Sequence, residues 1–274
     1  MNLSVVIPSL GNRNLIPTLN SIHNSSIVVD EIIISLPPNA KVDSNNFKKF
    51  NNIKLCFSTI KGQVAQRIHG FKTAKNNIIV QLDDDIILEY YCLERLLDFI
   101  NKNPKCAVSA HFHDLDSGLS IYQNLEKTYY KLFNYLKNGI KTSSNGIITK
   151  SGFETYPYFR RFSEPFQSEW IPGGCTMHLK KNLILHNYFP YSGKAYSEDL
   201  FHSIELKKNG IDLYYHPNAI AKLKVDKTKL SFKDFINNLS NDYIIRKILV
   251  KKNQLSIIRM NLAYIIKFVI YFFR

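Results

Sequence analysis

The stretch IIVQLDDD, residues 78–85, gives the strongest indication of the fold. Its first five residues, Ile78–Leu82, are mostly apolar and rich in β-branched side chains, and Asp83-Asp84-Asp85 follows without a break. A short apolar run of this kind predicts a strand buried on both faces, as in a parallel sheet covered by helices. Ligands of open α/β sheets bind beyond the carboxyl ends of the strands, where the three aspartates stand.

Similar runs extend this pattern over the first 110 residues. We expect four further strands, at Leu3–Ile7, Glu31–Ser35, Ile53–Phe57 and Cys106–Ala110. Amphipathic stretches between the strands predict helices around Leu15–Ile22 and at Gln63–Ala74 and Leu88–Ile100. Strands that alternate with helices predict an α/β fold, with helices on both faces of the sheet.

The second half of the chain is less regular. Residues 122–137 are compatible with a helix, and Lys141–Gly152 is polar and rich in serine and glycine, as in a loop or lid. We expect strands at Cys175–Leu179 and Asp212–Tyr215, and a helix at Glu198–Lys208 that an Asn-Gly pair ends.

The chemistry of Asp83-Asp84-Asp85 has two interpretations. Three adjacent carboxylates repel one another, so a divalent cation such as Mn²⁺ or Mg²⁺, or the hydroxyl groups of a ligand, would stabilise them. Alternatively, they form a solvated acidic turn that caps the helix starting near Leu88. The pattern alone does not choose between the two.

A second acidic pair, Glu198-Asp199, opens a predicted helix about 115 residues further on. A carboxylate at that place can act as a general base toward a hydroxyl group. For an isolated pair, favourable charge at a helix N-terminus is the better explanation.

Four blocks of the chain, taken in order, resemble family 2 glycosyltransferases, which have the GT-A fold. They are SVVIPSLGNRNLIPTLNSI at 4–22, GQVAQRIHGFKTAKNNIIVQLDDDI at 62–86, WIPGG at 170–174 and YSEDLFHSIELKKNGIDLYYHPNAIAKL at 196–223. The resemblance implies a Rossmann-like mixed sheet with helices on both faces. It also implies a catalytic domain at 1–225, with a nucleotide-binding half at 1–110 and an acceptor half at 111–225, and a basic helical extension at 226–274.

The resemblance assigns the nucleotide-sugar site to three segments: the loop after the first predicted strand, the helix at Gln63–Ala74 and Asp83-Asp84-Asp85. In the family, the loop after the first strand and one helix bind the nucleotide, which implies Pro8, Ser9, Asn12, Arg13, Gln63 and Arg67 here. Asp83-Asp84-Asp85 stands at the DXD motif, so Asp83 would lie near the ribose and Asp85, together with Asp83, would hold the metal ion on the diphosphate. Asp84 belongs to the same nucleotide-sugar site.

The remaining motifs imply the sugar, acceptor and catalytic positions. Trp170, Gly173 and Gly174 match the segment that lines the donor sugar and acceptor. Glu198-Asp199 matches the family's ED motif, in which the aspartate is the usual catalytic base.

Two positions depart from the family's pattern. Ser35 stands where the second strand usually ends in an aspartate that contacts the base of the nucleotide. Lys222 follows the block Pro217–Ala221, where the family often has a histidine as a further metal ligand. A protonated amine cannot bind a metal ion, but it can pair with a diphosphate. Our hypothesis is that Lys222 neutralises charge in place of that ligand, and the alternative is a solvated lysine.

The resemblance implies an inverting enzyme that moves a sugar from a nucleotide-diphosphate donor, with a UDP-sugar favoured. The acceptor would be a hydroxyl of a surface glycan or of a lipid-linked oligosaccharide, as in capsule or lipopolysaccharide synthesis. The enzyme would be cytoplasmic and peripheral on the inner face of a bacterial cell membrane. Two alternatives stay open: a nucleotide-sugar-binding module without activity, and a basic nucleic-acid-binding protein.

The net charge of +14 is concentrated near the C-terminus, where residues 222–274 hold twelve Lys or Arg against three Asp. Of the 36 basic residues in the chain, 28 are Lys, whereas nucleic-acid-binding proteins more often show Arg clusters with interleaved aromatic residues. We therefore expect no nucleic-acid partner.

The end of the chain has a helical charge pattern. Lys252, Arg259, Lys267 and Arg274 recur every seven or eight residues, which places them on one face of a helix that is otherwise apolar. Charges within the apolar stretch disfavour a transmembrane helix, and an in-plane helix at 252–274 on an anionic membrane fits better. The alternative is a helix packed on the catalytic domain or on a second subunit.

Other features are less specific. The four cysteines are scattered, so we expect neither a zinc site nor disulfides and infer a reducing compartment. The N-terminus lacks the pattern of a signal peptide. His111–Asp116 has metal-ligand residue types without partner clusters elsewhere, and we expect it to form a polar loop. Four aromatic residues either stack on an acceptor sugar or form core: Tyr156, Tyr158, Phe159 and Phe162.

Overall fold

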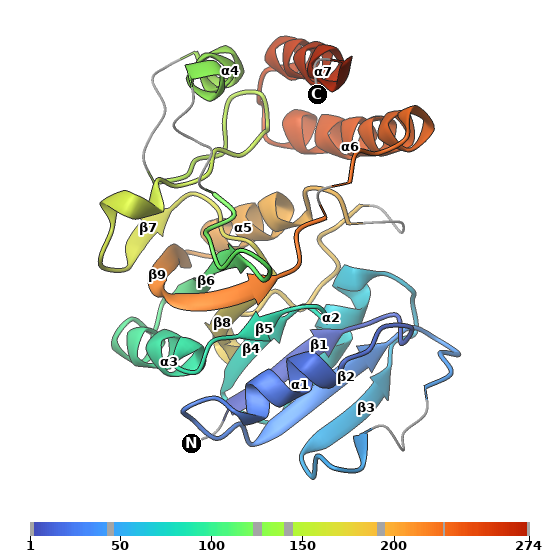
Figure 1. Ribbon diagram of the computed structural model, residues 1–274, viewed down its shortest axis with the longest axis vertical. Coiled ribbons are helices and arrows are strands. Elements are labelled where there is room, and N and C mark those ends of the chain that lie inside the picture. The colour runs from blue at the N-terminus through green and yellow to red at the C-terminus, as the bar shows by residue number, and fades with distance from the viewer. Residues whose placement is uncertain are drawn as a thin grey trace.

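The computed structural model of the protein describes residues 3–42, 47–122, 128–139, 145–190, 195–226 and 228–272. A central sheet carries helices on both faces, and three further helices gather at one end of the molecule (Figure 1). The predicted α/β architecture is confirmed.

The sheet has nine strands in the described part of the chain. Its first half is parallel, in the order β3 (Ile53–Phe57), β2 (Glu31–Leu36), β1 (Leu3–Pro8) and β4 (Ile78–Leu82). Its second half continues with β8 (Cys175–Leu179), β6 (Cys106–Asp114), β9 (Asp212–Leu223) and the short β5 (Ile87–Leu88), while β7 (Phe166–Ser168) also pairs with β9. Because β8 is antiparallel to both of its neighbours, the sheet is mixed rather than wholly parallel.

Alternating side chains of β1 explain why helices cover both faces of the sheet. Val5 and Ile7 belong to the large core that includes Leu19 of α1 (Ile16–His23), whereas Val6 packs with Phe71 of α2 (Gln63–Thr73). A strand buried on both sides requires apolar residues at successive positions, as the sequence has here. The remaining helices of the body are α3 (Cys92–Lys102) and α5 (Glu198–Lys208).

Two strands are longer than predicted. β9 runs twelve residues, to Leu223, and β6 includes His111–Asp114, which we expected to be a polar loop. These two segments pair with each other beyond an irregularity at Ala110/His111. The predicted helix at Leu88–Ile100 starts later, at Cys92, because Ile87–Leu88 pairs with β9 instead.

The C-terminal helices are present, as expected, and an earlier helix joins them. α6 (Phe232–Lys252) and α7 (Ile257–Phe272) lie beside α4 (Thr128–Asn138) at one end of the molecule (Figure 1). Their shared core contains Phe153, Val250 and Tyr264. None of the helices in the described ranges is long and apolar enough to cross a membrane.

Two basic residues of the tail contact the rest of the protein, as in the alternative of a helix packed on the catalytic domain. Lys267 Nζ lies 3.5 Å from Asp242 Oδ2, and Arg259 Nη1 donates a hydrogen bond to the Leu136 carbonyl (2.9 Å). Acceptors on α6 and α4 thus bind two of the four basic residues that the periodicity places on one face of the helix.

The two ends of the stripe differ from its middle. Lys252 is exposed and lies 3.5 Å from Glu205 of α5. Arg274 is outside the described residues.

Candidate functional site

The predicted site residues converge at the carboxyl ends of β1 and β4. The Asp83 N–H donates to the Gly174 carbonyl (2.9 Å), so the acidic turn after β4 is joined directly to the Gly173-Gly174 segment before β8. A Cβ added at Gly174 would meet the Phe112 ring at 3.2 Å and Asp83 Oδ2 at 3.5 Å. This approach leaves little space for a side chain at Gly174.

The loop after β1 is bound to the other two aspartates. Ser9 Oγ donates to Asp84 Oδ2 (2.7 Å), and Arg13 Nη1 donates to both Asp84 Oδ1 (2.8 Å) and Asp85 Oδ2 (2.6 Å). Arg13 and Asp85 are half exposed, whereas Asp84 is largely buried. Asp85 is therefore the aspartate of the three that is most open to a ligand, and Arg13 partly balances its charge.

The buried guanidinium of Arg67 connects the two acidic motifs. Its Nη2 donates to Asp83 Oδ1 (3.2 Å) and its Nη1 donates to Glu198 Oε1 (2.8 Å). Gln63, at the start of α2, also donates to Asp83 Oδ1 (3.1 Å). Motifs about 115 residues apart in the sequence thus share one side chain.

Glu198 has the environment of an anchored ion-pair partner. Burial alone would raise the pKa of Glu198, but the Arg67 guanidinium outweighs it, and the pKa is lowered. Tyr188 donates a further hydrogen bond to Glu198 Oε1. Sequence reasoning missed Tyr188, since nothing in its local pattern connects it to a helix that begins ten residues later.

Asp199 has the environment of a base. Its Oδ1 accepts a hydrogen bond from the Gly173 N–H (2.9 Å). Burial raises the pKa of Asp199 well above that of a free aspartate, and the negative charge of Glu198 adds to the shift. A Cβ added at Gly173 would lie 2.8 Å from Asp199 Oδ1, so glycine is needed for this approach.

Asp83 also binds its proton more tightly than usual. Burial raises the pKa of Asp83 to about 6, against the opposing effect of Arg67. The two carboxylates that pair with Arg67 therefore titrate differently, because the pKa of Glu198 is lowered and the pKa of Asp83 is raised.

Trp170 lies apart from the carboxylates, within an aromatic cluster. It is buried, and its indole N–H donates to the Thr155 carbonyl (2.9 Å). Tyr156 meets it edge to face, and Tyr122 stacks on Tyr156. Burial raises the pKa of Tyr122, and the Asp199 charge adds to the shift. Sequence reasoning missed Tyr122.

Among the other aromatic residues that the sequence singled out, Phe159 is buried, and Tyr156, Tyr158 and Phe162 pack partly buried against the core.

The two positions that depart from the family's pattern lie on different strands, Ser35 on β2 and Lys222 on β9. Lys222 pairs with Ile87 of β5, two residues after Asp85, and with His113 of β6. Ser35 is buried at the end of β2, opposite Pro8, and its carbonyl accepts from the Ser9 N–H (3.0 Å). Asn12 is exposed in the loop that holds Arg13.

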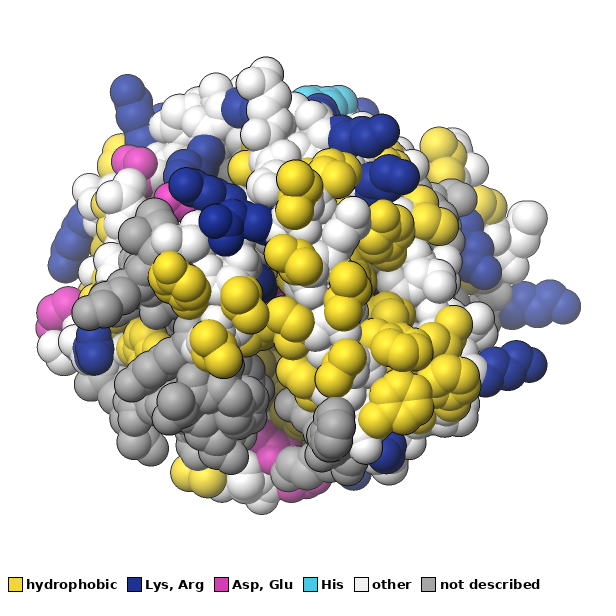
Figure 2. All heavy atoms as spheres, turned by 90° about the horizontal axis from the view of Figure 1, so that it is seen from above, with side chains coloured by type: hydrophobic (Ala, Val, Ile, Leu, Met, Phe, Trp, Pro, Cys, Tyr) yellow, Lys and Arg dark blue, Asp and Glu magenta, His cyan; other side chains and the backbone are white. Residues whose placement is uncertain are grey.

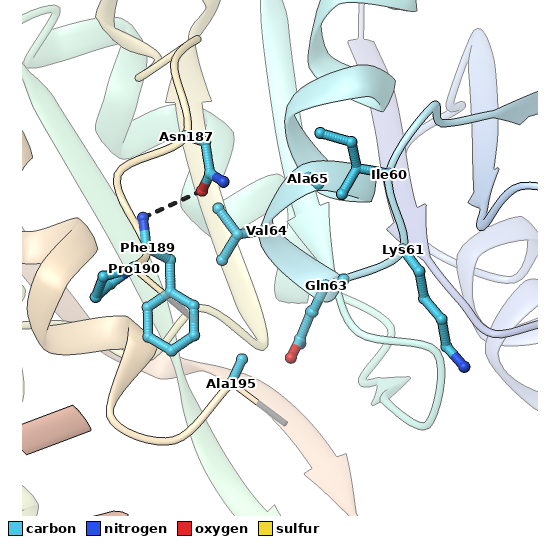
Figure 3. A pocket seen from close by; sticks show the side chains of 10 residues that line it. Ile60, Lys61, Gln63, Val64, Ala65, Asn187, Phe189, Pro190 and Ala195 are labelled. Carbon is cyan, nitrogen blue, oxygen red and sulfur yellow. Dashed lines mark hydrogen bonds between the residues drawn. The ribbon is translucent and has the colours of Figure 1, made fainter. Parts of the chain in front are cut away.

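A cavity of about 340 Å³ opens beside the site, between the start of α2 and the segment after β8 (Figure 3). Ile60, Lys61, Gln63 and Val64 line one side, and Asn187, Phe189, Pro190 and Ala195 line the other. Gln63 belongs both to this cavity and to the contacts of Asp83.

The acidic turn fits a metal ion that a bound ligand completes. Within the described ranges, no group of three or more His, Cys, Asp or Glu side chains could hold a metal ion by itself. Mg²⁺ and similar hard cations commonly bind one or two carboxylates together with substrate phosphates. Asp85 and Asp83 are the carboxylates that would hold such an ion.

Comparison with known proteins gives the same interpretation of the fold. The sequence profile described as glycosyl transferase family 2 matches residues 4–156. No curated protein sequence matches.

Three solved structures are similar to this chain. GalNAc-T7 with UDP, GalNAc and Mn²⁺ has a TM-score of 0.59 and 16% identity, over 82% of this chain and 44% of that one. Mannosyltransferase PcManGT from Pyrobaculum calidifontis, in complex with GDP-Man and Mn²⁺, has a TM-score of 0.56 and 13% identity, over 96% of this chain and 68% of that one. S. aureus TarS 1–349 has a TM-score of 0.52 and 14% identity, over 89% of this chain and 65% of that one. This chain thus spans less than half of the first structure, and the likenesses confirm the expected GT-A fold.

Proposed function

This chain belongs to glycosyl transferase family 2, and we propose from that premise that it is an inverting glycosyltransferase. It transfers a sugar from a nucleotide-diphosphate donor, with a UDP-sugar favoured, to a hydroxyl of a surface glycan or a lipid-linked oligosaccharide. The observation that carries the proposal is the Arg67 bridge, which joins Asp83 of the donor-side turn to Glu198, next to Asp199. A site for group transfer needs these two parts held at a fixed separation.

The donor side of the proposed site consists of the acidic turn and the loop after β1. Asp85 and Asp83 would hold a divalent cation, Mn²⁺ or Mg²⁺, whose charge stabilises the leaving diphosphate. Arg13, which already pairs with Asp84 and Asp85, is placed to exchange one of these partners for a phosphate oxygen. Pro8, Ser9, Asn12, Ser35 and Gln63 would complete the nucleotide contacts.

Asp199 is the proposed catalytic base. The Gly173 N–H fixes one carboxylate oxygen, and the other would take the proton of the attacking acceptor hydroxyl. Its raised pKa makes it a stronger base than a solvated aspartate. Because one displacement on the face opposite the diphosphate breaks and forms the anomeric bonds, the configuration inverts. We assign Glu198 the role of holding Arg67 and the N-terminus of α5 in place.

Lys222 supplies positive charge toward the diphosphate in our proposal. Its place on β9, paired with Ile87, supports this role. Lys222→Ala should lower the rate and raise the dependence on the divalent cation, whereas Lys222→His should restore a metal ligand. An unchanged rate and an unchanged cation dependence in both variants would refute the role.

A donor panel tests the function. Nucleotide release is measured for UDP-, GDP- and other sugar nucleotides, with Mn²⁺, Mg²⁺ or a chelator, for the full chain and for Asp199→Asn. We expect turnover of one donor class, dependent on the cation, and loss of transfer with donor binding retained in Asp199→Asn. If every donor binds without turnover, the chain is a nucleotide-sugar-binding module instead.

The acceptor and the location belong to the same proposal. A lipid-linked acceptor would be met at the inner face of the cell membrane, and the excess of basic residues from 222 onward supports attraction to anionic lipid.

A further inference from the structure

An apolar surface extends over α4 and α7, at the end of the molecule away from β3. On α7 it consists of Ile258, Leu262, Ile265, Val269 and Phe272, whose exposed fractions lie between 46% and 73%. On α4 it consists of Leu132, Tyr135 and Leu136, which are also exposed. We call this set the α4–α7 face. Figure 2 views the molecule from above these helices and shows apolar side chains gathered across the face, with Lys and Arg side chains around its edges.

The spacing on α7 makes the stripe continuous. The five positions are separated by four, three, four and three residues, so they lie along one side of the helix. Monomeric proteins rarely expose a contiguous run of large apolar side chains, and such a patch marks an interaction surface.

The exposed stripe is not the side by which α7 packs on the rest of the protein. Met260, Ala263 and Tyr264 are buried against Phe153 and Val250. The charged side chains of the helix also point inward, as Lys267 lies 3.5 Å from Asp242. The apolar stripe therefore faces outward, because the opposite side of α7 packs against the rest of the protein.

Hydrogen bonds fix α4 and α7 to each other. Arg259 Nη1 donates to the Leu136 carbonyl at the end of α4 (2.9 Å). A Cβ added at Gly139 would lie 2.7 Å from Arg259 Nη2, which shows how closely the two segments approach. The two apolar stripes thus belong to one preformed surface.

Basic side chains accompany this surface. α6, which packs against α7, exposes Lys233, Lys247 and Lys251. The acids of α6 offer little compensation, because the Asp234 carboxylate accepts a hydrogen bond from the Ser231 hydroxyl at the start of the helix and Asp242 is paired inward with Arg246. An apolar surface with a basic surround complements an anionic bilayer, whereas a second copy of a chain with a net charge of +14 would repel it.

We propose that the α4–α7 face lies on an anionic lipid bilayer, with α7 parallel to the membrane plane and its apolar stripe among the upper acyl chains. The inference rests on the proposed function in naming a bilayer as the partner, and it specifies the surface that meets it. The contact is made by apolar side chains, and the lysines around them add attraction to the lipid headgroups.

Vesicle flotation with the full chain tests the surface. Vesicles of phosphatidylcholine, with and without about one third phosphatidylglycerol, are mixed with the wild type, with Ile258→Gln plus Ile265→Gln, and with the control Val28→Gln plus Leu185→Gln. The control removes two exposed apolar side chains from other parts of the molecule. Melting temperatures should agree among the three proteins, because all four positions are at the surface.

We expect the wild type and the control to float with the anionic vesicles, less so at high salt, and the Ile258/Ile265 variant to lose at least about tenfold in partitioning. Equal partitioning of all three proteins, or no binding by the wild type, overturns the proposal. A wild-type dimer that the Ile258/Ile265 variant converts to a monomer, without vesicle binding, also overturns it and assigns the face to a second copy.

Nucleotide release from the same proteins separates this proposal from the proposed function. With a soluble donor, turnover should be equal in the wild type and the Ile258/Ile265 variant. Vesicle binding without turnover of any donor would refute the function and retain the membrane surface, and the converse result would refute the surface alone.

Discussion

Gly173 is the residue on which the position of Asp199 depends. Its N–H donates to Asp199 Oδ1 (2.9 Å), and its carbonyl accepts from Gln81 Nε2 (2.5 Å). Gln81 is buried in β4, so the backbone at Gly173 is held between the sheet and the proposed base.

Gly173→Ala should displace both Gln81 and Asp199, because the new Cβ would clash with Gln81 Nε2 and lie 2.8 Å from Asp199 Oδ1. We expect kcat to fall about tenfold to a hundredfold, in line with a small misplacement of a reacting group, while the Kd of the donor changes little. Steady-state kinetics and calorimetry measure the two quantities. Gly118→Ala is a control for backbone strain outside the proposed site, since its φ of 69° disfavours any side chain but a Cβ there meets nothing within 4 Å, and its kcat should stay normal. A normal kcat in Gly173→Ala would mean that Asp199 does not act from this position.

Asp199 should determine the acidic limb of the pH–rate profile. A base acts only when deprotonated, so the rate of transfer rises with pH through the pKa of Asp199 and is constant above it. Burial and then Glu198 raise this pKa, so the limb should lie above the ordinary aspartate range near 4. Asp199→Asn should remove the limb and lower kcat by about 10²- to 10⁴-fold. A limb at the ordinary aspartate pKa would reassign the base.

At the scale of elements, Arg246 ties α6 to the residue before α5. Its guanidinium donates to the Gly152 carbonyl (2.6 Å), to Ser197 Oγ (2.5 Å) and to Asp242 Oδ1 (3.1 Å). Ser197 has a φ of 54°, an unfavourable left-handed conformation, directly before Glu198. α6 therefore helps to hold Ser197 and, with it, the start of α5, where the proposed base Asp199 stands.

Arg246→Met should destabilise the protein by about 3–5 kcal/mol, because it leaves buried carboxylates without their partner. Urea unfolding measures this change, and kcat should fall as well because Ser197 keeps its bond to Asp242 but loses the one from Arg246. Lys247→Met, an exposed neighbour on α6, should change the free energy of unfolding by less than about 0.5 kcal/mol. A similar effect of both substitutions would show that the Arg246 cluster contributes nothing specific.

The elements that the sequence predicted well are those buried on both faces. β1, β2 and β4 are almost wholly buried and consist mainly of successive apolar residues, a pattern that is typical of few other structures, whereas β3 at the edge of the sheet is mostly only partly buried. The extensions of β6 and β9 were missed because they contain His113 and Lys222, polar residues that pair with each other across the strands. A two-residue strand such as β5 carries no periodicity at all.

Part of the candidate site was predictable for a related reason. Asp83 and Asp199 stand at the ends of regular elements, where the order of motifs along the chain identifies them. The partners that define their environment, such as Arg67 for Glu198 and the Gly173 N–H for Asp199, come from other segments of the chain. The contacts of the tail helix were not predictable for the same reason, since Lys267 of α7 meets Asp242 of α6, 25 residues before it.

At the scale of the whole molecule, α7 has two roles, and a deletion would remove both of them at once. Its outer side is the proposed membrane surface, while Met260, Ala263 and Tyr264 on its inner side complete a core with Phe153 and Val250. Loss of membrane binding after removal of α7 would therefore not distinguish lost lipid contacts from a damaged fold.

Deleting residues 255–274 should lower the free energy of unfolding by roughly 3–6 kcal/mol, the transfer free energy of two large buried side chains. It should also increase the binding of a hydrophobic dye and lower kcat, since Tyr264 and Lys267 no longer hold Asp242 beside Arg246 and Ser197. Ile258→Gln plus Ile265→Gln, which changes only the outer side, should leave all three quantities as in the wild type. If the deletion leaves stability and kcat unchanged, α7 serves the bilayer alone, and its contacts with Asp242 contribute neither to folding nor to the position of Ser197 before α5.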